Sequence, residues 1–147
     1  METLELAALR LATGLQVPEE LPSIAADALV GGFDSPMLRV AAGASTRDPD
    51  EARDTFTAAL AELGIEIPGL EEALWRLVRY TADQIVSGQV SPYDGAAWIW
   101  WKVQIRMQAE GDLRIFAGLA SEWEELPNQR IEIDRAIVEE ARVEGCA

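Results

Sequence analysis

Apolar residues recur along this chain at the spacing of amphipathic helices. Between residues 49 and 63, Phe56 and Leu60 fall on one helical face, and residues 70–86 carry an apolar stripe opposite a charged one. The alternation of apolar and polar residues that is typical of a strand is confined to residues 65–67, a segment too short to build a sheet. The pattern predicts an all-α protein, with helices at about residues 4–13, 19–30, 36–43, 49–63, 70–86, 92–109, 112–125 and 128–143.

Several helix starts are marked by residues with clear capping chemistry. Ser35, Asp48 and Ser91 each precede a proline, so their side chains can accept a hydrogen bond from a free backbone N–H of the first turn. The connections between helices are short, which favours antiparallel neighbours. We therefore expect residues 1–147 to form one compact domain of seven to eight helices, built as stacked helical hairpins or an orthogonal bundle, with a frayed tail at about 144–147.

The two halves of the chain share one short pattern. Residues 11–20 and 85–94 each hold a glycine that is followed four residues later by a proline, at an offset of 74 residues. The identities are limited to these two residue types, which any helix-turn-helix unit would supply. The sequence therefore allows a weak two-fold repeat with halves of about 1–68 and 69–147, and shared helix punctuation without duplication is the interpretation that we favour.

Residues 92–109 hold three of the five tryptophans. On a helical wheel Trp98 and Trp101 fall on one side and Ile99 falls on another, with only a narrow charged strip between them. A helix that is apolar on two sides must be covered on two sides. We expect this segment to be the central, buried helix, so that replacing Trp98 or Trp101 by alanine costs about 3–5 kcal/mol.

The chain is strongly acidic. Its 26 Asp and Glu against 12 Lys and Arg leave a net charge of −14, while 49% of the residues are hydrophobic, which is enough for an ordinary core. A surface that binds nucleic acid must neutralise phosphates with cations, so this balance argues against a nucleic-acid partner. The longest apolar run, residues 96–101, is far too short to cross a bilayer, and we expect no membrane association.

The N-terminus and the cysteine content favour a cytoplasmic protein. The first residues are acidic where a secretory signal is basic, and a lone cysteine cannot form an internal disulfide, which suits a reducing compartment. Eleven of the twelve cations are arginine and alanine is abundant, a bias typical of GC-rich bacterial genomes.

Missing residue types exclude most familiar catalytic sites. The chain has no histidine, and its one cysteine, Cys146, lies next to the end. Histidine-based triads, imidazole bases and zinc sites of histidines or four cysteines are therefore excluded. Neither a phosphate-binding glycine loop nor a nucleophile elbow occurs. We predict no catalytic residue, no metal and no cofactor, and an enzyme built on carboxylates alone stays an alternative.

Two groups of residues are candidates for binding. Residues 73–109 combine four cations with most of the aromatic side chains, which suits an anionic or aromatic small ligand, although arginine stems that simply cover tryptophans are the interpretation that we favour. The candidate ligand residues are Trp75, Arg76, Arg79, Trp98, Trp101, Lys102 and Arg106. The candidate residues for contact with a protein partner are Asp48, Asp50, Glu51, Asp54, Glu132, Asp134, Glu139 and Glu140.

The predicted function is a non-catalytic interaction or adaptor domain that binds a basic protein. Long-range attraction between opposite charges favours such a partner, and immunity proteins, antitoxins and regulators form the broad class. This assignment depends on composition, because no family motif is present. The alternative is a small-ligand binding protein that uses the Trp/Arg-rich region. A homodimer whose seam is an exposed indole cluster is a further alternative.

Overall fold

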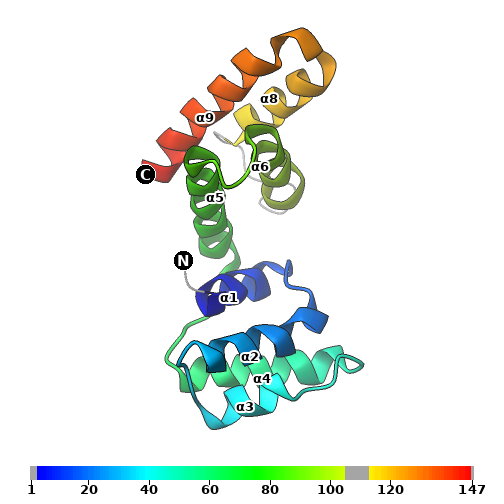
Figure 1. Ribbon diagram of the computed structural model, residues 1–147, viewed down its shortest axis with the longest axis vertical. Helices are drawn as coiled ribbons and strands as arrows, with labels where there is room; N and C mark the ends of the chain where they lie inside the picture. The colour runs from blue at the N-terminus through cyan, green and yellow to red at the C-terminus, as the bar shows by residue number, and fades with distance from the viewer. Residues whose placement is uncertain (1–2, 105–112, 147) are drawn as a thin grey trace. The chain divides into compact units, whose positions relative to one another are not determined.

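The computed structural model describes residues 3–104 and 113–146 of the chain. Within these two ranges the regular elements are all helices, and no strand occurs (Figure 1). The predicted all-α class is therefore confirmed. None of the described helices is long and apolar enough to cross a membrane.

The chain divides into two compact units, Met1–Ala73 and Leu74–Ala147. Each unit has a hydrophobic cluster of its own, and the two clusters share no residue. The division falls inside helix α5 (Leu70–Ser87), a few residues after the boundary expected between the two halves of the sequence. The tryptophan-rich segment contributes to the cluster of the second unit, and a single domain over residues 1–147 stays a prediction.

Within its described residues the first unit holds four complete α-helices, one short 3-10 helix and the first turn of α5. In it α2 packs against both α3 and α4, and α1 contacts α2. Phe56 and Leu60 of α4 are fully buried together with Leu21 and Leu38, as the apolar face predicted from the sequence requires. The elements are α1 (Thr3–Thr13), η1 (Pro18–Glu20), α2 (Leu21–Val30), α3 (Pro36–Ala42) and α4 (Pro49–Glu62).

The three helix starts with predicted capping residues are confirmed. The side chains of Ser35, Asp48 and Ser91 accept a hydrogen bond from the backbone N–H three residues later, at 3.1, 3.1 and 3.2 Å. Each capping residue is followed by the proline that opens its helix. Local chemistry alone fixes these starts, because the cap satisfies a backbone donor that has no partner within the helix.

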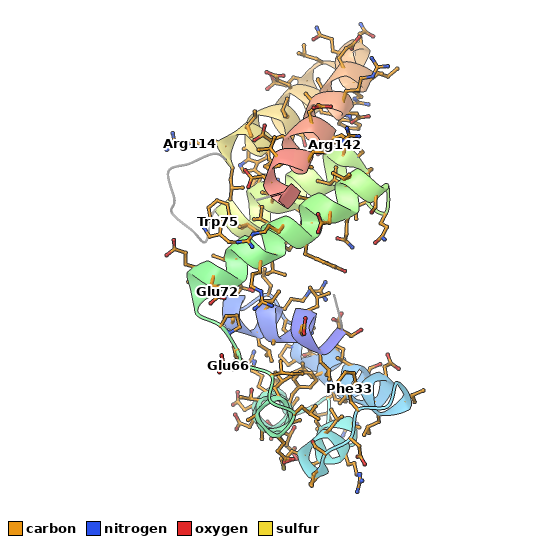
Figure 2. The ribbon with its side chains drawn as sticks, turned by 90° about the vertical axis from the view of Figure 1, so that its left-hand side faces the viewer. Phe33, Glu66, Glu72, Trp75, Arg114 and Arg142 are labelled. Atoms are coloured by element: carbon orange, nitrogen blue, oxygen red, sulfur yellow. The ribbon has the colours of Figure 1, made fainter. Side chains whose placement is uncertain are left out.

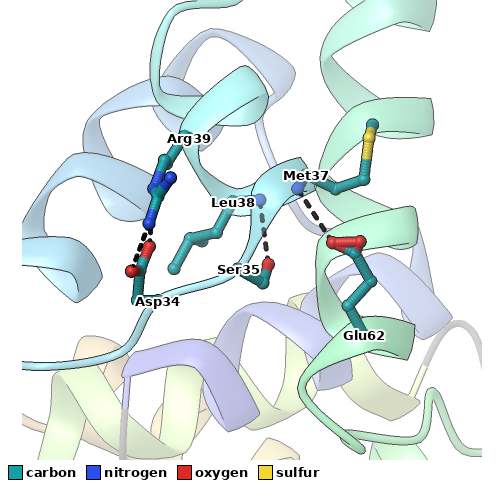
Figure 3. A network of polar contacts seen from close by, with 6 residues as sticks. All are labelled: Asp34, Ser35, Met37, Leu38, Arg39 and Glu62. Carbon is teal, nitrogen blue, oxygen red and sulfur yellow. Dashed lines mark hydrogen bonds and ion pairs between the residues drawn. The ribbon is translucent and has the colours of Figure 1, made fainter.

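The start of α3 is also held by the end of α4 (Figure 3). The backbone N–H of Met37 donates to Glu62 Oε1 at 2.8 Å, so a carboxylate from the last residue of α4 satisfies a free donor of the shorter helix. Beside it, Arg39 donates two hydrogen bonds to Asp34, at 2.8 and 2.5 Å. These hydrogen bonds lower the pKa of the Asp34 carboxyl below its ordinary value. Polar contacts thus add to apolar packing in orienting α3 on α4.

The second unit contains the remaining helices. Its fully buried side chains include Ile99, Val103, Phe116 and Ile137. The last helix runs to Cys146, so helix continues through most of the predicted tail at 144–147, and Glu144 is buried. The elements after α5 are α6 (Pro92–Trp98), the π-helix η2 (Ile99–Gln104), α8 (Arg114–Glu125), the 3-10 helix η3 (Pro127–Gln129) and α9 (Arg130–Cys146).

The tryptophan-rich segment is not the interior rod that the sequence predicted. Its α-helix ends at Trp98 and continues as the π-helix, while residues 105–109 of the predicted helix lie outside the described residues. Trp98 is half-buried and Trp101 is 55% exposed. The fully buried positions are small or aliphatic, namely Gly95, Ala96, Ile99 and Val103. The segment is therefore buried mainly along this one stripe, because small residues let neighbouring helices approach more closely than indoles would.

One turn has the same hydrogen bonds in both units. Gly14 and Gly88 adopt φ values of 73° and 80°, which only glycine reaches without strain. In each turn the two following residues donate to the carbonyl oxygen four residues before the glycine, that of Arg10 at 2.9 and 3.2 Å and that of Gln84 at 3.0 and 3.2 Å. The glycine-to-proline pattern seen in the sequence thus encodes one repeated turn, and duplication of whole halves stays a prediction.

Candidate functional site

The predicted ligand residues lie in different environments. Trp75 on α5 (Figure 2) and Trp98 are half-buried against the second core, and Arg76 is half-buried. Arg79, Trp101 and Lys102 are exposed. Arg106 lies outside the described residues. A ligand pocket formed by these side chains stays a prediction. An open depression on this unit, along α9, is lined by other residues.

Among the described residues, an aromatic pair that also contacts an arginine side chain is centred on Trp123, outside the group of predicted ligand residues. The ring of Tyr93 stacks on the indole with a centroid separation of 4.1 Å and an interplanar angle of 17°. The guanidinium carbon of Arg130 lies 3.8 Å from the centroid of the same indole. Two planar groups this close to one ring must occupy its opposite faces. We call Tyr93, Trp123, Glu124 and Arg130 the Trp123 clasp.

Polar contacts complete the Trp123 clasp. Arg130 Nε donates to the backbone oxygen of Trp123 at 3.0 Å, and the Tyr93 hydroxyl donates to Glu124 Oε1. The four residues come from the first turn of α6, the last turn of α8 and the first residue of α9. The clasp therefore fixes the turn between α8 and α9 against α6.

The Trp123 clasp is built for packing rather than for ligand binding. Both faces of the indole are covered, so no face is left on which a ligand could stack. The indole Nε1 is buried and has no hydrogen-bond partner among the described residues. The sequence did not reveal this cluster, because Tyr93 and Trp123 are far apart in the chain and Arg130 stands where a helix start was expected.

Tyr93 gives the second unit a predicted dependence on alkaline pH. Its hydrogen bond to Glu124 raises the pKa of the hydroxyl above the ordinary value, because the phenolate would face a carboxylate. A pKa raised in the folded state means that this stabilisation is complete below the unfolded pKa and is lost as pH rises through the folded value. We expect the free energy of unfolding to fall above about pH 10.

The measurement is urea denaturation between neutral and alkaline pH for the wild type and for Tyr93→Phe. The variant lacks the hydroxyl, so its unfolding free energy should fall less over the same pH interval. Absorbance of tyrosinate locates the titration independently. Identical pH profiles for the two proteins would show that the hydrogen bond contributes nothing.

The acidic residues predicted to face a partner are only partly available. On α4, Asp48, Asp50, Glu51 and Asp54 are all exposed. Asp48 already caps the helix, and Asp50 pairs with Arg53 at 3.5 Å. On α9, Glu132 and Glu139 are exposed, whereas Asp134 and Glu140 are half-buried. The α4 group is thus the more accessible acidic surface.

A shallow, open depression of about 400 Å³ lies along one side of α9. It is lined by Ile131, Asp134, Arg135, Val138, Glu139 and Arg142, which share one helical face. The Asp134 Oδ1 atom is buried without a hydrogen-bond partner in the described part of the chain. The mixed lining offers contacts for apolar side chains and for charges of both signs.

Neither a metal-binding geometry nor a comparison with known proteins indicates what these surfaces bind. Within residues 3–104 and 113–146, no group of three or more Asp, Glu or Cys side chains is arranged to hold a metal ion. Comparison of the chain with protein-family models, with curated proteins and with solved structures finds no match. Function therefore has to be inferred from the charge and exposure of the surfaces themselves.

Proposed function

We propose that this protein is a non-catalytic binding protein whose partner is a basic protein. The observation that carries the proposal is the concentration of charge in the first unit, where 14 acidic residues stand against four arginines. Two of these arginines are engaged in ion pairs, Arg39 with Asp34 and Arg53 with Asp50. The field of this unit is therefore negative and attracts cationic surfaces over the Debye length.

The solvent side of α4 is the proposed contact surface. Asp50, Glu51 and Asp54 fall on the side of the helix opposite the buried Phe56 and Leu60, at one end of the solvent face. Further along the same face the exposed residues are small, as at Thr57 and Ala61. Because these side chains are short, the backbone of a partner helix or strand can approach α4 closely while its lysines or arginines reach the carboxylates.

The biological class that fits this chemistry is a protein that occupies a basic surface of its target. Immunity proteins, antitoxins and regulators that block a partner form this broad class, and binding through surface charge requires no histidine, cysteine or metal. A small ligand at the Trp/Arg-rich region is the weaker proposal, since Trp101 and Arg79 are exposed rather than grouped around a cavity.

The experiment compares two double variants that remove the same charge from different units. Tagged wild-type protein first captures a partner from native lysate at low salt, and the dissociation constant is then measured with the purified partner. Glu51→Gln with Asp54→Asn should weaken binding about tenfold, because two charges at the contact are lost. Glu122→Gln with Glu125→Gln, exposed positions on α8, is the control and should change it little.

Added salt should weaken binding of the wild type more than binding of the α4 variant. Equal losses in both double variants would mean that only net charge matters, and a captured partner that is not basic would contradict the proposal directly.

A further inference from the structure

We draw no further inference here: the strongest candidate, the open depression along α9 beside the exposed side chain of Ile131, carries none, because nothing in the structure shows what covers it.

Discussion

Replacing Phe116 by alanine is expected to lower the free energy of unfolding of the second unit by about 3–5 kcal/mol. The side chain is fully buried in the cluster that also contains Ile99, Val103 and Ile137. Its removal takes apolar area out of the core and leaves a cavity that α8 and α9 can fill only in part. Urea denaturation followed by circular dichroism measures the change.

The matched control is Trp101→Ala, which removes a larger side chain from an exposed position. The indole of Trp101 stacks on that of Trp100 at a centroid distance of 4.9 Å, and Trp101 is 55% exposed. We expect its replacement to change stability by no more than about 1 kcal/mol. A larger loss for Trp101→Ala than for Phe116→Ala would restore the interior helix that the sequence suggested and contradict the burial found here.

The second large effect is expected at Gly95, where α6 passes close to α5. A methyl group on Gly95 would lie 2.5 Å from Ile85 Cδ1 and closer still to Cγ1, and Ile85 is itself buried. The isoleucine would have to leave its position in a close-packed core. We expect Gly95→Ala to lower the unfolding free energy by about 1–3 kcal/mol, measured in the same denaturation experiment.

Gly118 in the middle of α8 provides the opposite case. It is exposed, and nothing lies within 4 Å of the position where a methyl group would be added. Alanine there should raise stability by about 0.5–1 kcal/mol, because it restricts the unfolded chain and favours helix. Equal effects at the two glycines would mean that contact with Ile85 does not limit residue 95.

The sequence predicted the fold where short-range chemistry decides it. The caps at Ser35, Asp48 and Ser91 and the left-handed glycines act within a few residues, so their spacing was sufficient to place helix ends. Burial of the tryptophan-rich segment was mispredicted because a helical wheel gives the angle between side chains but not which side meets the core. Gly95 and Ala96, rather than the indoles, mark the buried side.

The candidate sites were less predictable from the sequence, because they depend on contacts between residues that are far apart in the chain. The Trp123 clasp joins residues from three helices, and nothing local to Tyr93 or Arg130 indicates the indole between them. The acidic surface of α4 was predictable, because solvent-exposed carboxylates need no partner in the chain.

The division of the chain at Ala73 also separates the fluorescent side chains from one of the two units. All five tryptophans and both tyrosines lie after this point, so ultraviolet emission excited at the indole band originates only in the second unit. Circular dichroism, in contrast, records helices on both sides of the division. Comparing the two signals during one unfolding experiment therefore separates the events of each unit without a label, and a single tryptophan introduced at Phe56 would make the first unit visible as well.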